Sequence, residues 1–352
     1  MRWISVRAGP AMAFGMGLVA AVAVVTCVNK KEPVEDPNRP ILIRPTLPLA
    51  IPGLKGHTIQ TLCVNVKKYG KDVAPDAKAS LEFRERTIAH VLALAGVSVV
   101  GEHESCEGTL NVWLSSEALG APYTDHRFHF TGARAEGRVT LSIAGLPAQS
   151  FQIEDEIDVA RSVLRDAGLD EASTPEQFEA MSVALLKGLT GIWGADLLVR
   201  LLQHGTPHSL AINPASRGEE LGRVFGSLGL RAMEDASAKL MPLLGMQDVD
   251  NDAVRSCLKT LGKPAVGELA AVLKGNNFEA VHQAIEALDG IGPDAWEAVP
   301  ALIGILRGEA AGLREDSARA LLRICEPRSK GGELRGFGED ADRWQDWWDQ
   351  HK

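Results

Sequence analysis

Two cysteines in the first third of the chain are the residues best suited to covalent chemistry. Cys63 and Cys106 fall within one small predicted domain. In an exported chain, two cysteines in such a domain are candidates for a disulfide. Their approach depends on the fold, so the bonded and the free state both stay open at this stage. Cys257 and Cys325 take apolar positions in predicted helices, where buried free thiols are expected.

The histidines do not form a recognisable catalytic or metal-binding set. His126 and His129 are three residues apart and on a strand would point to opposite faces. No third ligand is near them, although a metal site needs three or four. His204 and His208 bracket a Gly-Thr-Pro turn and share no helix face. We therefore predict no metal ligands, no catalytic residues and no cofactor.

The motifs of common enzyme classes are also absent from the sequence. It contains no G-x-S-x-G, no H-E-x-x-H, no Walker loop and no C-x-x-C. Asp125, Glu136 and the acids of residues 154–158 lie in loop-like or strand-end contexts, so a solvated surface is expected for them. A hydrolase would need two such carboxylates within roughly 10 Å in a cleft. We expect a protein that is not an enzyme and keep the hydrolase as an alternative.

Residues 1–31 have the layout of a secretory signal or a single membrane-spanning helix. Arg2 and Arg7 precede an uncharged, apolar run over residues 8–28, and two lysines follow. An uncleaved anchor would keep the basic end in the cytoplasm. Alternatively, residues 24–27 (VVTC) resemble a lipobox, with Thr where Gly or Ala is usual, and make Cys27 a candidate for lipidation. A third possibility is signal-peptide cleavage after the Ala-Val-Ala of residues 21–23. In all three cases the body is exported, to the periplasmic or extracellular side.

Residues 32–56 are predicted to form a linker between this membrane segment and the body. Six prolines stand between positions 33 and 52, and proline favours an extended spacer. The formal charge of the whole chain is −9, and residues 1–31 hold four bases and no acids, so the body is more acidic still. An acidic body argues against nucleic acid as a partner.

Residues 57–158 are predicted to form a small α+β domain. Residues 58–68 alternate apolar and polar side chains as a strand does, and residues 77–96 carry a helical apolar stripe that Gly96 ends. The remaining expected strands are short, at residues 97–100, 109–115, 137–143 and 149–153. This order predicts one helix over a mainly antiparallel sheet.

Residues 159–352 are predicted to be entirely helical. A capping box at residues 174–177 opens a helix that is expected to break at Gly188 and Gly191, and a second capping box stands at residues 216–219. Repetition follows: the segment 265–273 recurs as 298–306 at an offset of 33, and 253–261 matches 280–288 at an offset of 27. Repeats of this length indicate helix pairs stacked into a solenoid.

Part of this helical region resembles a known family. The segments 298–303 (AVPALI) and 318–324 (ARALLRI) look like the two helices of bacterial HEAT repeats, and residues 340–348 are similar to the tail that often ends such arrays. The chain therefore resembles a bacterial HEAT-repeat envelope protein with a signal anchor or lipoprotein-like signal. The resemblance covers residues 250–352 well and the preceding helices loosely. It implies an α-solenoid used for protein contacts, with no catalytic residue to carry over.

Two functions from different classes follow from these observations. The first is a non-enzymatic, membrane-tethered scaffold of the bacterial cell envelope, in which the HEAT-like solenoid of residues 159–352 binds an unidentified protein partner. The second is a small-ligand or cell-wall binding protein, whose site would lie in residues 57–158 on the sheet face beside Trp113.

Overall fold

The computed structural model describes residues 47–67, 77–101, 105–166, 174–204, 217–329 and 332–352. All of them belong to one compact unit. The predicted membrane segment with Cys27, the linker up to residue 46, and the second capping-box serine lie outside the described residues. Within the described ranges, no helix has both the length and the apolar character that crossing a bilayer requires.

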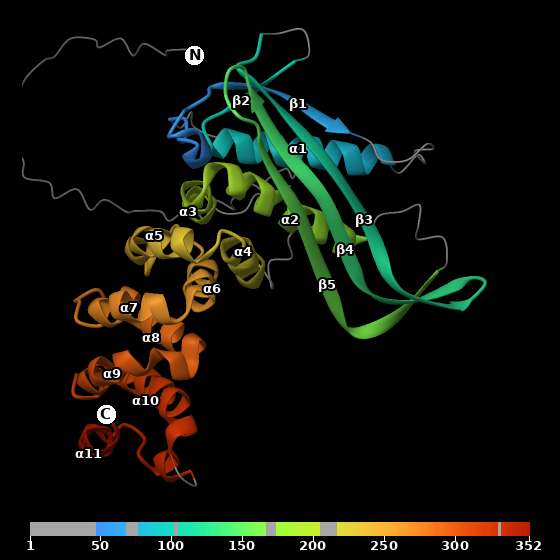
Figure 1. The fold of residues 1–352 in the computed structure, drawn as a ribbon. Coiled ribbons are helices and arrows are strands. Elements are labelled where there is room, and N and C mark those ends of the chain that lie inside the picture. The colour runs from blue at the N-terminus through green and yellow to red at the C-terminus, as the bar shows by residue number, and fades with distance from the viewer. Residues whose placement is uncertain (1–46, 68–76, 102–104, 167–173, 205–216, 330–331) are drawn as a thin grey trace, which may run out of the picture. The chain divides into compact units, whose positions relative to one another are not determined.

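A five-stranded mixed sheet forms the first part of the body (Figure 1). The strand order is β2-β1-β3-β4-β5. β1 lies between β2 and β3 and runs parallel to both, whereas β4 is antiparallel to its neighbours β3 and β5. The mainly antiparallel sheet expected from the sequence is therefore mixed. The bounds are β1 Thr61–Lys67, β2 Ser98–Val100, β3 Gly108–Thr124, β4 Arg127–Ile143 and β5 Gln149–Asp166.

The last three strands are much longer than the sequence predicts. β3 and β4 each have 17 residues and β5 has 18. In β4, the buried positions include Ala133, Ala135 and Gly137 between exposed polar residues. Alternation of buried and exposed side chains therefore continues through small residues, which a search for large apolar residues overlooks. β5 also extends past residue 158, the predicted end of the small domain; the division into domains stays a prediction.

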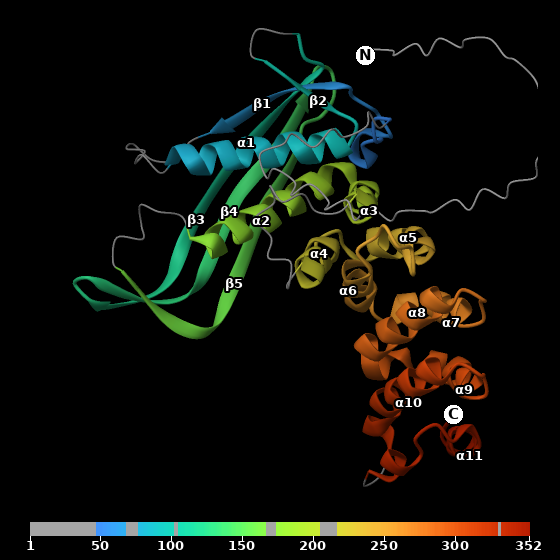
Figure 2. The ribbon, with the colours of Figure 1, turned by 180° about the vertical axis from the view of Figure 1, so that it is seen from behind.

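Two helices, rather than the single expected helix, cover one face of the sheet (Figures 1 and 2). α1 (Ala77–Leu94) packs along β1 and β2, and α2 (Pro175–Trp193) packs on β3, β4 and β5. The predicted capping box that opens α2 is present: Gln177 N donates to Thr174 Oγ1 (3.2 Å), and Thr174 N donates to Gln177 Oε1 (2.9 Å). The end of the predicted linker also packs here, since Ile51 is fully buried.

The break predicted at Gly188 and Gly191 is wrong, because α2 continues through both glycines to Trp193. A Cβ on Gly188 would lie 2.7 Å from Val139 Cγ2, and one on Gly191 would lie 2.7 Å from Phe151 Cδ1. Contacts that short do not occur in packed proteins. Both glycines therefore let the helix approach the sheet closely instead of ending the helix.

The rest of the described chain is a helical region that begins with α2. After α2, the helices pack in two rows (Figures 1 and 2). In the first row α4, α6, α8 and α10 pack one on the next, and in the second row α3, α5, α7, α9 and α11 do so, partly through short 3₁₀ turns. The bounds are α3 Ala195–His204, α4 Arg217–Gly226, α5 Leu230–Leu240, α6 Asn251–Leu261, α7 Val266–Val272, α8 Phe278–Ile291, α9 Val299–Leu306, α10 Ala311–Cys325 and α11 Ala341–His351.

The segments that recur in the sequence adopt the same local structure. α6 is capped by the side chain of Asp250, which accepts from Ala253 N (3.1 Å). α8 is capped in the same way by Asn277, 27 residues later, which accepts from Ala280 N (3.2 Å). Both helices end in a left-handed glycine of nearly equal geometry, with φ 70° and ψ −133° at Gly262 and φ 69° and ψ −136° at Gly292. Each glycine leads into a 3₁₀ turn and then a short helix, α7 or α9.

The last helix supplies large aromatic side chains to the end of the second row. Trp344 and Trp347 on α11 are buried, and Trp348 is partly buried. Trp348 lies over Trp296, with the ring centroids 4.6 Å apart. Trp347 Nε1 donates to Glu333 Oε1 (3.1 Å), so its polar atom is also satisfied. These side chains therefore belong to the core, as expected for a helix that covers the end of a helical array.

Candidate functional site

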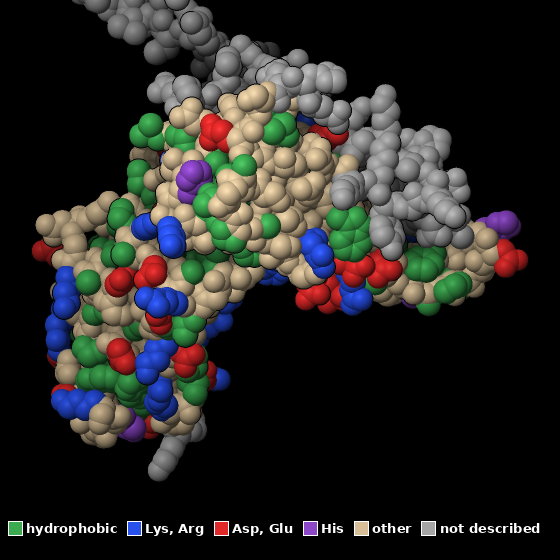
Figure 3. Space-filling view, turned by 45° about the horizontal axis from the view of Figure 1, so that its top comes forward, with side chains coloured by type: hydrophobic (Ala, Val, Ile, Leu, Met, Phe, Trp, Pro, Cys, Tyr) green, Lys and Arg blue, Asp and Glu red, His purple; other side chains and the backbone are tan. Residues whose placement is uncertain are grey.

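Polar and charged side chains connect the neighbouring helices α6, α8 and α10, and the surface that carries them is here called the α6–α8–α10 face. Arg255 of α6 donates to Gln283 of α8. Arg319 of α10 pairs with Glu286 of α8, and Arg323 Nη1 of α10 lies 3.4 Å from Asp289 Oδ2 of α8. Each helix is thus joined to the next by charged or polar side chains. Figure 3 shows side chains of both charges over the helical region.

A cavity of about 440 Å³ opens between α4, α6 and α8. Its charged lining consists of four carboxylates and two cations, so its balance is acidic: Glu219, Asp250, Asp252, Glu286, Arg255 and Lys259. Two glycines complete the wall on either side of α6: Gly218 of α4 and Gly290 of α8. The cavity therefore suits a basic or neutral polar group better than an acidic one.

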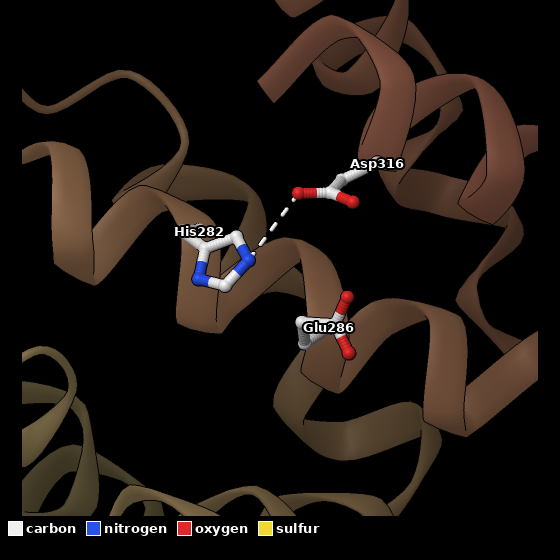
Figure 4. A group of neighbouring side chains, drawn as sticks. All are labelled: His282, Glu286 and Asp316. Atoms are coloured by element: carbon white, nitrogen blue, oxygen red, sulfur yellow. Dashed lines mark ion pairs between the residues drawn. The ribbon is translucent and has the colours of Figure 1, made fainter. Parts of the chain in front are cut away.

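Three side chains on this face converge from two helices (Figure 4). His282 and Glu286 are one turn apart on α8, and Asp316 comes from the facing α10. One ligand atom from each lies within 4.8 Å of the others. His282 Nε2 is 3.2 Å from Asp316 Oδ2. All three residues are partly exposed to solvent, so an ion has access to them.

Arg319 lies against the same three residues. Its Nη2 is 3.0 Å from Asp316 Oδ1, and it also pairs with Glu286 Oε1. The other oxygen of this carboxylate, Asp316 Oδ2, faces His282. The guanidinium, which is half-exposed, balances one of the two negative charges when no other cation is present.

A buried ionic network joins the sheet to the helical region. Asp155 of β5 is almost fully buried, which corrects the expectation that the acids of residues 154–158 are all solvated. Its Oδ1 accepts from Lys187 Nζ of α2 (2.9 Å), and its Oδ2 lies 3.2 Å from Arg223 Nη2 of α4. Burial raises the pKa of Asp155, and the two cations oppose that rise. The same cations donate to backbone oxygens of Glu154 and Glu156 (2.9 Å each), so they also cover part of the sheet edge.

Glu220 of α4 extends this network. Arg223 pairs with both Glu220 and Asp155. Burial raises the pKa of Glu220 to about 7; hydrogen bonding and charge from Arg223 lower it, and the neighbouring Glu179 of α2 raises it further. Glu220 therefore changes its protonation state near neutral pH, in the region where α2 and α4 meet the sheet.

The structure joins Cys63 and Cys106 by a disulfide, with their Cα atoms 5.7 Å apart. β1 lies beside β3, and Cys63 is in register with Thr109, so the bond ties β1 to the segment that leads into β3. Cys257 and Cys325 are free and buried. Burial raises the pKa of both thiols, that of Cys325 to about 12, so neither is a ready nucleophile.

The histidines singled out in the sequence do not gather into a site within the described residues. His126 lies in the turn between β3 and β4. His129 lies in β4, where its Nε2 is 3.3 Å from Ser162 Oγ and its ring stacks on Tyr123 (6.1 Å). His204 ends α3, and His208 lies outside the described residues.

The convergence of His282, Glu286 and Asp316 was not predicted from the sequence. The i, i+4 spacing of His282 and Glu286 was visible, because residues four apart share a helix face. The third member was not, because it requires the register of α10 against α8. The sequence repeat gives part of the register between α8 and α10. Glu286 and its ion-pair partner Arg319 are 33 residues apart, which is the offset of the repeat.

Comparisons with known proteins leave the family of the chain open. No protein-family profile matches the sequence, and no curated protein matches it. Among solved structures, a crystal structure of the rare lipoprotein B from Shewanella oneidensis matches, with 18% sequence identity over 32% of this chain and 76% of that chain, at a TM-score of 0.19. A likeness at this TM-score carries no argument about fold or function, so the function rests on the chain's own residues.

Proposed function

We propose that the chain is a non-enzymatic scaffold that binds a partner protein through a HEAT-like α-solenoid built from α3 to α11. The observation that carries the proposal is the repetition within the two rows of helices: equal caps at Asp250 and Asn277, and equal junctions at Gly262 and Gly292. Arrays of this kind extend one surface over several helices, and such surfaces serve mainly to hold other molecules.

The α6–α8–α10 face is the part of the array that we propose for partner binding. Its side chains are polar and exposed enough to meet a partner: Asp252 is 76% exposed and Arg323 is 59% exposed. Charged side chains that pair between neighbouring helices are already held in one orientation. They therefore lose less conformational entropy when a partner binds. Together with the acidic cavity beside α4, they favour a partner surface with basic and polar groups.

We propose further that this scaffold works in the cell envelope, tethered to a membrane. The support is the sequence of residues 8–28 and the basic residues around it, which lie outside the described residues. The disulfide between Cys63 and Cys106 agrees with an oxidising compartment, in which such bonds persist.

A second candidate is a small-ligand or cell-wall binding protein that uses residues 57–158. The observation in its favour is an uncovered end of the sheet, where Tyr123 of β3 is 63% exposed beside His129. Exposed aromatic rings combine an apolar face with a polar tip and occur frequently at binding surfaces. The cavity between α4, α6 and α8, by contrast, is lined by residues from 218 onward, and so is a second cavity beside Glu234 and Glu268.

The proposal is tested by affinity capture from an envelope extract with the full-length chain. The variant Asp252→Lys/Arg323→Glu reverses two exposed charges on the α6–α8–α10 face and leaves the net charge unchanged. A matched control, Glu234→Lys/Lys274→Glu, does the same at two exposed residues of α5 and of the turn that follows α7. Partner proteins should be retained by the wild type and by the control, and reduced about tenfold by the face variant, because like charges across an interface are strongly unfavourable.

Other outcomes distinguish the candidates. If both variants retain the same proteins equally, the α6–α8–α10 face is not the binding surface, and the scaffold proposal fails in its present form. If the wild type retains only glycan, and Tyr123→Ala abolishes that retention, the second candidate replaces the first.

A further inference from the structure

We propose that His282, Glu286 and Asp316 form a binding site for a zinc-class transition-metal dication, held between α8 and α10. This inference does not depend on the proposed function, because it rests only on these side chains. The three ligands combine one imidazole and two carboxylates, each of which binds Zn²⁺ in proteins.

The spacing of the ligand atoms already approaches that of a tetrahedral site. Zinc lies about 2.0–2.1 Å from imidazole nitrogen and about 2.0–2.2 Å from carboxylate oxygen, so two of its ligands stand roughly 3.4 Å apart. His282 Nε2 and Asp316 Oδ2 are 3.2 Å apart. The Glu286 carboxylate completes a set whose ligand atoms all lie within 4.8 Å of one another, so bringing them to this separation requires side-chain movement of up to about 1.4 Å.

The helices hold these ligands in place before any ion arrives. His282 and Glu286 share the face of α8 that packs on α10, because they are four residues apart. α8 and α10 are neighbours in the first row and share a buried core that includes Ile285 and Leu321. The site therefore draws its ligands from two fixed elements, which limits the conformational freedom lost on binding.

Arg319 competes with the ion for the same carboxylates. It pairs with Glu286 and with Asp316 Oδ1, the oxygen that does not face His282. Its side chain is 50% exposed, so the guanidinium can turn into water when an ion takes its place. Because it then remains close to a dication, Arg319 should weaken metal binding. A variant without this charge should bind metal more tightly.

The donor set favours zinc-class ions over calcium and magnesium. Imidazole suits Zn²⁺, Ni²⁺ and Cu²⁺, whereas Ca²⁺ takes six to eight oxygen ligands and Mg²⁺ demands octahedral oxygen coordination. Three protein ligands leave a fourth tetrahedral position for water or for a donor from another molecule. That open position lies on the α6–α8–α10 face, beside a cavity that Glu286 also lines.

The test is isothermal titration of the metal-free, full-length chain with Zn²⁺, and separately with Ca²⁺. One Zn²⁺ should bind per chain, and His282→Ala should weaken that binding by more than about tenfold, since even outer-shell changes have effects of 10- to 100-fold. Asp316→Asn, which keeps the size of the side chain, should also weaken it. Arg319→Gln should tighten it by about tenfold, since it removes a nearby like charge. His126→Ala, in an exposed turn, should leave it unchanged.

Thermal unfolding gives a second readout. Zn²⁺ should raise the midpoint of the wild type in a concentration-dependent way and should not raise that of His282→Ala. The proposal is overturned if no saturable 1:1 binding occurs, if His282→Ala binds Zn²⁺ as the wild type does, or if Arg319→Gln weakens binding. Ca²⁺ binding as tight as that of Zn²⁺ would refute the assigned class of ion.

Discussion

Substitution of Glu220 by Gln should remove a pH-dependent loss of stability at the junction between the sheet and the helices. Burial raises the pKa of this carboxyl in the folded protein from 4.5 to about 7. The folded chain therefore binds the proton more tightly than the unfolded chain does. Its contribution to stability is complete below about pH 4.5 and is lost as the pH rises through about 7.

The size of the effect follows from the difference between the two pKa values. One pKa unit corresponds to about 1.4 kcal/mol, so ionisation of Glu220 at high pH removes at most about 3.5 kcal/mol of stability. About 2.5 kcal/mol of this should be lost between pH 5 and pH 8. Gln resembles the protonated carboxyl in size and still offers an oxygen to Arg223. The variant should thus match the wild type near pH 4 and be about 3 kcal/mol more stable at pH 8.

Denaturant unfolding at a series of pH values measures this difference directly. Other groups titrate over the same range, but they do so in both proteins, so the difference between Gln variant and wild type isolates Glu220. Glu179→Gln serves as a control on the cause. Since Glu179 helps to raise the pKa of Glu220, its removal should shift the wild-type transition to lower pH.

Two results would refute this account of Glu220. If the stability difference between Glu220→Gln and the wild type does not change with pH, the carboxyl does not titrate near neutrality. If the variant is less stable than the wild type at pH 8, the charged pair with Arg223 outweighs the burial of the carboxylate.

Two further predictions concern packing and the disulfide. Gly188→Ala should destabilise the fold by about 1–3 kcal/mol, because the added Cβ would lie 2.7 Å from Val139 Cγ2. In contrast, Gly304→Ala should stabilise the fold by about 0.5–1 kcal/mol, because Gly304 lies in α9 and an added Cβ there would have no neighbour within 4 Å. Thermal melts of the two variants check this, and equal shifts would contradict it. Replacing Cys63 and Cys106 by Ser should lower stability by about 4 kcal/mol, since their bond closes a loop across a sequence separation of 43. Denaturant unfolding with and without reductant measures that change, and an unchanged midpoint in both would argue against the bond.

The helical elements were the most predictable part of the fold, because their signals are local. The capping box at Thr174 and Gln177 and the stop at Gly96 act within a few residues, and the structure has both. The long strands were harder. Their alternation passes through Ala133, Ala135 and Gly137, which are too small to stand out as buried positions; at Gly137 an added Cβ would clash with the carbonyl oxygen of Trp113 on β3, a contact that only the strand pairing reveals.

The two groups of charged residues, around Asp155 and around Asp316, were less predictable than the fold, because each depends on how separate elements pack on one another. Asp155 belongs to a run of acids that looks solvated, yet it is buried because Lys187 and Arg223 arrive from α2 and α4. Nothing near residue 155 in the sequence marks those partners. The same holds for Asp316, whose neighbour His282 is reached only through the packing of α10 on α8.

The glycines of α2 explain why the predicted helix break is wrong, and they indicate how packing glycines can be told from terminating ones. A glycine inside a helical pattern predicts the end of the helix, yet Gly188 lies so close to the sheet that an added Cβ would be 2.7 Å from Val139 Cγ2. The same occurs in α4, where Gly218, Gly222 and Gly226 stand four apart and lie on α6; an added Cβ at each would come within 3.0–3.1 Å of α6 side chains. Terminating glycines such as Gly262, in contrast, adopt positive φ. Glycines repeated on one helix face therefore indicate close packing, and isolated ones before a proline or 3₁₀ turn indicate an end. In a chain with 35 glycines and 5% aromatic residues, close approach of backbones supplies contacts that larger side chains provide elsewhere.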